Sequence, residues 1–136
     1  DEWRLGFRGE VPVREDRSLR DSDYEDANLI LFGDPGSNEI LAKVARKLPI
    51  RWTREGVKVG DKTYGPDHVP VLVYPNPLNK YRYVVINTGH TWTAKDLAAS
   101  NAYLTPKLPD WAVLKLGGSR PEVVAADYFD ESWKLK

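Results

Sequence analysis

The sequence contains no cysteine, and its positive and negative charges cancel. Without cysteine the chain can form no disulfides, no thiolate nucleophile and no thiolate metal site. Twenty basic residues balance twenty acidic ones, so no overall electrostatic field attracts nucleic acid or an acidic lipid surface. No apolar run approaches the roughly 18 residues that a membrane helix needs. We therefore expect neither nucleic acid nor a membrane as a partner.

The sequence also lacks the common catalytic signatures. It has no G-x-S-x-G motif, so the nucleophile of an α/β-hydrolase is not in this chain. Residues 33–37 (GDPGS) have neither the Lys-Ser/Thr ending of a P-loop nor the spacing of a dinucleotide fingerprint. The two histidines, His68 and His90, show no metal-binding spacing. We assign no catalytic residue, metal or cofactor, and leave open whether the chain is an enzyme.

The clearest structural signal lies in residues 28–48. An apolar run over 28–32 predicts a buried strand, and Gly33 and Pro35 break it. Apolar residues then recur at helical spacing from 40 to 48, until Pro49 ends the pattern. Ser37 and Asn38 are both suitable N-cap residues. The stretch therefore predicts a strand, a loop and a helix.

Further strands and one more helix are expected downstream. Residues 70–74 and 81–87 are two buried-strand candidates joined by too few residues for a crossover helix, so they should form an antiparallel hairpin or lie side by side. Thr93 is a plausible N-cap for a second helix over 94–104. The other expected elements are short antiparallel strands at 50–53 and 57–59, strands at 111–116 and 121–126, and an aromatic tail at 128–133 that docks on the sheet.

These elements predict one domain of the α/β class. The expected architecture is a three-layer Rossmann- or flavodoxin-like domain, with a mixed, mainly parallel sheet and few helices. Residues 1–27 would form a helix tail and a charged connection with a short helix from Ser18, and residues 28–136 the sheet-forming core. Because the segment with Trp3, Leu5 and Phe7 begins without a cap or a preceding strand, we expect it to be the tail of a helix whose beginning is missing. Apolar surface left uncovered would then bind another chain or a second copy.

Polar and aromatic residues follow several of the expected strands. If these strands are parallel, their loops meet at one edge of the sheet, where ligands of α/β proteins bind. A simpler explanation is that asparagine and aspartate stabilise turns, that Ser37 caps a helix, and that His90 holds its own loop through hydrogen bonds. On this basis we expect His90 to be partly buried and closer to Asp34 than to His68. The candidate ligand-binding residues are Asp34, Ser37, Asn76, Asn87, His90 and Trp92.

Several motifs in order resemble a known protein family. They are NLILFGDPGSN, LPIRWT, a YG…H segment, PVLVYPNPLN, YRYVVINTGHTW and WAVLKLGG, and the resemblance spans about residues 3–118. This succession resembles the domain that follows the catalytic module in large secreted bacterial hydrolases of the prolyl-oligopeptidase and esterase type, members of the α/β-hydrolase superfamily. The family has a further strand and helix upstream of the Trp3 segment, so the resemblance implies that this chain lacks the first strand and helix of the fold. The Ser-His-Asp machinery of the family belongs to a separate module, and no residue here matches it.

The resemblance implies an accessory, non-catalytic domain of a secreted or periplasmic serine hydrolase, which helps the domains pack or engages the substrate. Its partners would be the upstream hydrolase module or a second chain, and its substrate an ester or a carbohydrate. Two alternatives remain open. The chain could be a small hydrolase that acts through Asp34, Ser37 and His90, or a carbohydrate-binding module that uses exposed tryptophans such as Trp52 or Trp92.

Overall fold

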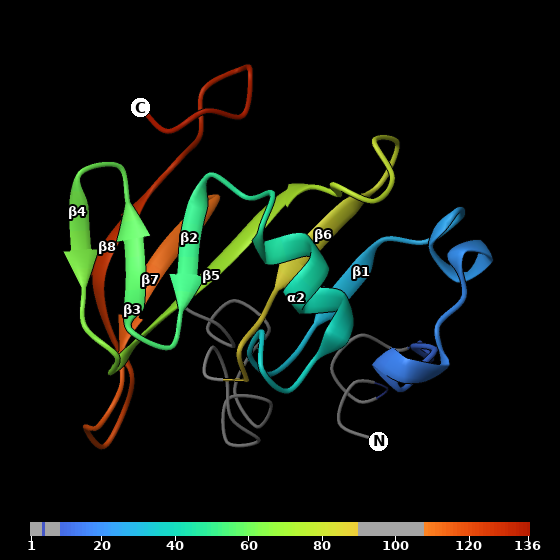
Figure 1. Ribbon diagram of the computed structural model, residues 1–136, viewed down its shortest axis with the longest axis horizontal. Helices are drawn as coiled ribbons and strands as arrows, with labels where there is room; N and C mark the ends of the chain where they lie inside the picture. Colours follow the sequence, from blue (N-terminus) through green and yellow to red (C-terminus); the bar gives the residue numbers. More distant parts are fainter. Residues whose placement is uncertain (1–3, 5–8, 90–107) are drawn as a thin grey trace.

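The computed structural model describes residues 4, 9–89 and 108–136, and its largest element is a five-stranded sheet (Figure 1). The strand order is β1-β6-β5-β7-β8. The strands of this sheet are β1 (Leu29–Leu31), β5 (His68–Pro75), β6 (Tyr83–Ile86), β7 (Trp111–Lys115) and β8 (Glu122–Asp127).

The pairing directions correct the predicted fold class. Only β1 and β6 are parallel, whereas β5 pairs antiparallel with both β6 and β7, and β7 pairs antiparallel with β8. Over the described residues there are eight strands and a single α-helix. The expectation of a mainly parallel, three-layer Rossmann- or flavodoxin-like α/β domain is therefore wrong. An apolar run indicates that a strand is covered on both faces, but it does not show the direction of its neighbours.

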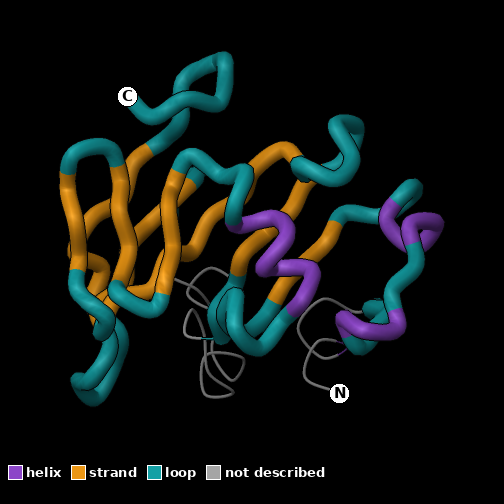
Figure 2. Tube along the Cα trace, in the orientation of Figure 1, coloured by secondary structure: helices purple, strands orange, loops and turns teal. Residues whose placement is uncertain are grey.

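A second layer covers one face of this sheet (Figure 2). It consists of the helix α2 (Glu39–Ala45) and a small antiparallel sheet formed by β2 (Ile50–Thr53), β3 (Gly56–Val59) and β4 (Lys62–Tyr64). The main core lies between the layers, where Leu41, Val44 and Val57 are fully buried. Val71, Ala112 and Leu114 form a smaller cluster that is separate from the main core, with Val69 and Leu108 packed against it. The covering layer is thus mostly β, where the prediction had helices.

The helix α2 follows the sequence pattern closely. Asn38 is its N-cap, and the Asn38 side chain accepts a hydrogen bond from the Leu41 N–H at 2.9 Å. The short 3-10 helices η1 (Asp16–Ser18) and η2 (Asp21–Tyr24) precede β1 and replace the single helix expected from Ser18. The Asp16 carboxylate accepts a hydrogen bond from the Glu39 N–H at 2.6 Å, and this bond holds the pKa of Asp16 below its usual value. The charged connection is therefore tied to the first turn of the helix.

The hairpin of β5 and β6 is confirmed, with Leu72 opposite Ile86. Pro70 lies inside β5, although proline lacks the N–H that a central strand needs. The N–H of Val73 donates to Asp110 on the β7 side, so by alternation the nitrogen of Pro70 faces the β6 side. Because the pairing with β6 stops at Leu72, no ladder bond is lost there.

The aromatic tail also docks as the sequence indicated. Phe129 is buried, and its ring lies 5.3 Å from that of Tyr74 in an edge-on arrangement. The Tyr74 hydroxyl donates a hydrogen bond to the Trp133 carbonyl at 3.1 Å. The tail therefore closes one end of the core. The expected helices around Leu5 and over 94–104 lie outside the described residues, and none of the described helices is long and apolar enough to cross a membrane.

Candidate functional site

The predicted binding residues that the structure describes lie at opposite ends of the strands of the large sheet. Asp34 and Ser37 follow β1, and Asn87 follows β6; because these strands are parallel, the three residues lie at the same end of the sheet. The N–H of Asn87 donates to the Leu31 carbonyl at 2.9 Å, which fixes the two loops side by side. Asn76 follows β5, which runs in the opposite direction, and so lies at the other end. His90 and Trp92 lie outside the described residues, so their expected positions stay predictions.

Asp34 and Ser37 form a closed turn. The Asp34 carboxylate accepts hydrogen bonds from the N–H groups of Gly36 at 2.6 Å and Ser37 at 3.2 Å. The Ser37 hydroxyl accepts from the Asp34 N–H at 3.0 Å and donates to the Asp34 carbonyl at 3.2 Å. Gly33 is needed next to it, because a Cβ there would lie 2.7 Å from the Ser37 hydroxyl oxygen. Both side chains therefore satisfy their own backbone, as expected of turn residues.

Asn76 shapes the turn between β5 and β6. It is 2% exposed, and its side-chain oxygen accepts a hydrogen bond from the Leu78 N–H at 2.9 Å. Its carbonyl accepts from the Asn79 N–H at 3.0 Å. Asn76 is thus a buried turn residue that a ligand cannot reach from solvent.

The described histidine forms no metal centre. Nδ1 of His68 lies 2.7 Å from a carboxylate oxygen of Asp67, an ion-pair distance, but the angle does not fit a hydrogen bond. The centre of the Tyr64 ring lies 5.5 Å from the centre of the His68 imidazole, so the tyrosine covers one side of the histidine. Among residues 4, 9–89 and 108–136, no group of three or more His, Cys, Asp or Glu side chains could hold a metal ion.

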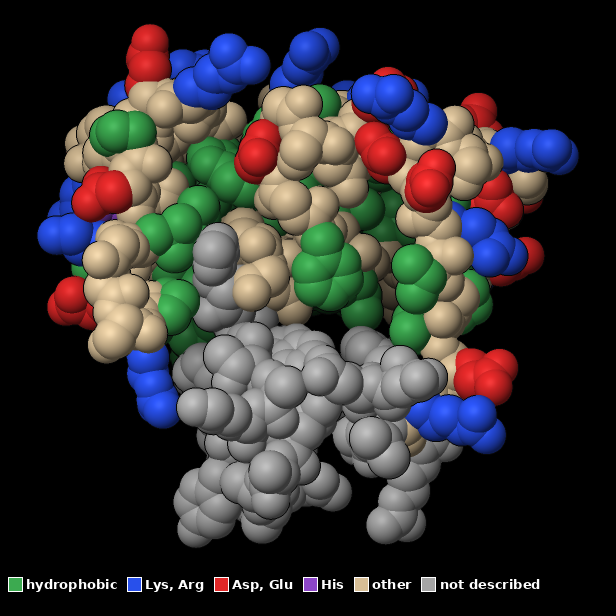
Figure 3. Space-filling view, turned by 90° about the horizontal axis from the view of Figure 1, so that it is seen from below, with side chains coloured by type: hydrophobic (Ala, Val, Ile, Leu, Met, Phe, Trp, Pro, Cys, Tyr) green, Lys and Arg blue, Asp and Glu red, His purple; other side chains and the backbone are tan. Residues whose placement is uncertain are grey.

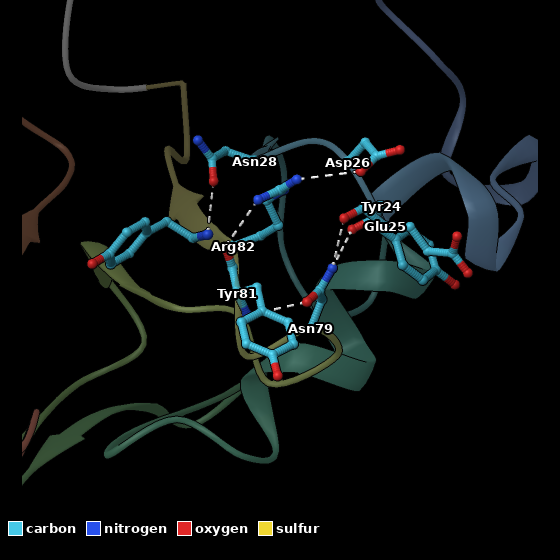
Figure 4. Close-up of polar contacts among 8 residues, drawn as sticks. Tyr24, Glu25, Asp26, Asn28, Asn79, Tyr81 and Arg82 are labelled. Atoms are coloured by element: carbon cyan, nitrogen blue, oxygen red, sulfur yellow. Dashed lines mark hydrogen bonds and ion pairs between the residues drawn. The ribbon is translucent and has the colours of Figure 1, made fainter.

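A polar network joins the segment before β1 to the β5–β6 turn (Figure 4). The Asn79 side-chain amide donates to the carbonyls of Tyr24 at 2.9 Å and Glu25 at 3.0 Å. Its oxygen accepts from the Tyr81 N–H at 3.1 Å. Arg82 forms an ion pair with Asp26 at 3.3 Å. The contacts made with Tyr24, Glu25 and Asp26 link residues more than fifty positions apart, so the network holds the segment before β1 against the turn between β5 and β6.

Beside this network lies an open groove of about 710 Å³, which we call the tyrosine groove. Tyr81 stands at its rim and is 75% exposed, with the ammonium of Lys80 4.9 Å from its ring centroid. The Tyr24 hydroxyl donates to the Asp21 carboxylate at 2.6 Å, and this bond raises the pKa of Tyr24. The full lining is Asp21, Tyr24, Glu25, Lys43, Leu78, Asn79, Lys80 and Tyr81. The groove thus combines an exposed aromatic ring with side chains of both charges.

A second groove, of about 650 Å³, lies along the outer side of β1, and we call it the β1 groove. Its lining is mostly apolar and includes Val11, Pro12 and Leu19 opposite the strand. Two large apolar side chains of the strand segment are accessible there, since Ile30 is 39% and Phe32 52% exposed. Seen from below, hydrophobic side chains are exposed at several places on the lower face of the molecule, with most acidic and basic side chains toward its outline (Figure 3).

Neither groove was anticipated from the sequence. Tyr81 reads as part of a strand in YRYVVIN, and Ile30 as part of a strand buried on both faces. The tryptophan proposed for carbohydrate binding, Trp52, is only partly exposed and packs against the main core. One signal was present, since the paired prolines and asparagines around Pro75 and Asn79 mark a turn, and exposed aromatics beside turns are accessible to ligands.

Comparisons of this chain with family models, with curated proteins and with solved structures found no match. The resemblance to the accessory domain of a hydrolase accordingly stays a prediction that rests on the sequence motifs.

Proposed function

We propose that this chain is a non-catalytic accessory domain that packs beside a serine hydrolase and helps it to assemble or to engage its substrate. The ordered motifs that resemble the post-catalytic domain of secreted bacterial hydrolases supply the context. The observation that carries the non-catalytic part is the turn of Asp34 and Ser37. Both side chains are engaged in hydrogen bonds with their own backbone.

This turn disfavours the alternative of a small hydrolase. A nucleophilic serine needs a general base within hydrogen-bond reach of its hydroxyl. The hydroxyl of Ser37 is hydrogen-bonded to Asp34 backbone atoms on both its donor and its acceptor side. Attack on a carbonyl would require the turn to open, which would also disturb the start of α2. The residues therefore support a structural role better than a catalytic one.

We predict that the purified chain turns over no ester, peptide or glycoside substrate, and that Ser37→Ala changes no rate. The same substitution should lower the free energy of unfolding by about 1 kcal/mol, because a turn hydrogen bond is lost. Ser132→Ala is the matched control, since the Ser132 N–H, and not its hydroxyl, donates to Asp130. Turnover that disappears in Ser37→Ala would make the chain an enzyme and overturn the proposal.

The hydrolase context has its own test. The reading frame upstream of Asp1 should encode a G-x-S-x-G module, and that module should co-purify with this domain when both are expressed. An upstream sequence without such a nucleophile motif would contradict the hydrolase part of the proposal and leave the non-catalytic part standing.

The tyrosine groove favours carbohydrate binding as a second candidate function. Sugar rings stack on exposed aromatic faces, and hydroxyl groups bond to neighbouring carboxylates and ammonium groups. Tyr81 offers the exposed ring, while Glu25 and Lys43 line the same groove. This groove is distinct from Trp52, one of the tryptophans that the sequence suggested.

We predict that a hexasaccharide bound in the tyrosine groove is held about tenfold less tightly by Tyr81→Ala, the equivalent of roughly 1.4 kcal/mol. Titration calorimetry with chitohexaose, xylohexaose and maltohexaose measures this change. Tyr128→Ala is the control, because Tyr128 is also exposed but lines neither groove. Equal losses in both variants, or no binding of any of the three, would contradict a saccharide site here.

A further inference from the structure

The positive charge of this chain is concentrated in the layer that covers the large sheet. Residues 40–64 form most of α2 and the whole of the small sheet, and they contain seven basic and two acidic residues, a net charge of +5. The whole chain has a net charge of zero, so the other residues together carry −5. Overall neutrality therefore hides a basic layer. We call its basic residues the basic surface: Lys43, Arg46, Lys47, Arg51, Arg54, Lys58 and Lys62.

The basic surface is open to solvent. All seven of its residues are exposed, and Figure 1 shows α2, β2, β3 and β4 next to one another in the covering layer. In the part of the chain that the structure describes, none of the seven forms an ion pair. The two acidic residues of the layer, Glu55 and Asp61, lie in the turns at opposite ends of β3. The positive charges are thus not neutralised within the described structure.

Two of these cations lie directly opposite each other in the small sheet. Arg51 of β2 is the register partner of Lys58 of β3, and Lys58 is the partner of Thr63 of β4. The neighbouring residues Ile50 and Val57 are buried, so by alternation this row faces solvent. Like charges directly opposite each other destabilise a strand pair. An anion held between the two cations would relieve their repulsion, so the row is suited to a carboxylate.

The basic surface continues into the tyrosine groove. Lys43 belongs to both, and Arg46, the C-cap of α2, follows it at a spacing of three residues, which places the two side chains on the same side of the helix. Within the groove, the ammonium of Lys80 lies 4.9 Å from the centroid of the Tyr81 ring. A sugar that stacks on Tyr81 therefore has cations beside it, and a longer chain of sugars would pass over Lys43 onto the basic surface.

We propose that the tyrosine groove and the basic surface together bind an acidic polysaccharide. A sugar ring stacks on Tyr81, and the carboxylates of uronate units bind to the cations, with one of them on the row of Arg51 and Lys58. The proposal rests on the saccharide site proposed above and names the class of its ligand. Charge complementarity distinguishes such a ligand from a neutral saccharide.

The groove also distinguishes an acidic polysaccharide from other anionic polymers. Its lining includes the carboxylates of Asp21 and Glu25. These groups repel the phosphates of nucleic acid and the carboxylates of an acidic peptide, whereas they accept hydrogen bonds from the hydroxyl groups of a sugar. Over residues 39–64 no large hydrophobic side chain is exposed, so the basic surface has none to stack on a base or to enter a membrane.

Hexagalacturonate and its methyl ester are the matched probes, because they have the same sugar rings and only the first is charged. In titration calorimetry, hexagalacturonate should bind about tenfold more tightly than the ester at low salt, and the difference should shrink as salt is raised. Tyr81→Ala should weaken the binding of both probes, since both stack on the ring.

Removal of the two central cations separates charge from stacking. The double variant Arg51→Gln, Lys58→Gln should bind hexagalacturonate about tenfold less tightly at low salt and the methyl ester as before. It should remain folded, because both side chains are exposed and their mutual repulsion is lost. The matched control is Lys115→Gln, Arg120→Gln, which removes two exposed basic residues elsewhere and should change the binding of neither probe.

Equal binding of hexagalacturonate and its methyl ester would overturn the proposal, and so would equal effects of the two double variants. Tighter binding of duplex DNA or of hexaglutamate than of hexagalacturonate would do the same, since the surface would then bind anions in general. Absence of the saccharide site is a separate result, in which Tyr81→Ala changes the binding of neither probe, and the proposal then falls with the site.

Discussion

Substitution of Gly56 by alanine should lower the free energy of unfolding by roughly 3 kcal/mol or more. Gly56 is buried at the start of β3 and has a φ of +135°, a conformation that L side chains rarely adopt. A Cβ there would lie 1.9 Å from the Tyr64 carbonyl oxygen and 2.7 Å from that of Gly65. Because both atoms are backbone, β3 and β4 would have to separate. Urea unfolding followed by tryptophan fluorescence measures the loss.

Gly60→Ala is the matched control. Gly60 also has a positive φ, of 56°, but a Cβ there would meet no atom within 4 Å. The backbone conformation alone should cost about 1 kcal/mol. Equal losses in the two variants would mean that the small sheet relaxes around the new methyl group, and would contradict the importance of the close approach.

Substitution of Leu41 by alanine should lower the free energy of unfolding by about 3 kcal/mol. Leu41 is fully buried in the main core, where α2 packs on the large sheet, so its loss leaves a cavity that the surrounding backbone cannot fill. Such a loss is a large share of the 5–15 kcal/mol that stabilises a typical domain.

Lys43→Ala is the control on the same helix, because Lys43 is exposed and alanine has the higher helix propensity. Its effect should stay within about 0.5 kcal/mol. Thermal unfolding monitored by circular dichroism separates the two variants. A loss at Leu41 no greater than at Lys43 would show that α2 contributes little to the core.

Local elements were predictable because their causes lie within a few residues. The helical spacing and the N-cap at Asn38 predicted α2, and the short link between two apolar runs predicted the β5–β6 hairpin. The tail with Phe129 also docks as predicted. The helix and the hairpin depend on residues close together in the sequence, and the tail was predictable from its run of aromatic residues.

The fold class could not be predicted in the same way. The sequence has two stretches in which a strand is followed by a loop and helical spacing, and this repetition suggested a parallel sheet. Strand direction is set by which strands become neighbours, and β5 lies between β6 and β7 and opposes both. That choice depends on contacts between distant residues, which leave no local pattern.

In the candidate site too, some features are local and could be predicted, whereas others depend on the tertiary structure. The turn chemistry of Asp34 is local, and the sequence-based explanation of turn residues describes its hydrogen bonds well. The expectation that Ser37 caps the helix is wrong, because its hydroxyl bonds to the Asp34 backbone and Asn38 is the N-cap. Asn76 and Asn87 lie at opposite ends of the sheet, and this follows only from the direction of β5. The exposure of Ile30 is likewise a result of tertiary structure, because an aliphatic strand residue gives no sign of which face of the sheet will be covered.

The sequence by itself determined the balanced charge, the absence of thiol chemistry, the positions of α2 and of several strands, and the turns that join them. Composition, period and capping act over short distances and are therefore present in the chain before it folds. Only the tertiary structure decided the mixed, mostly antiparallel order of the large sheet, its small covering sheet and the place of β1 at one end of the described strand order. These depend on which distant segments bury each other, and many pairings satisfy the same local pattern.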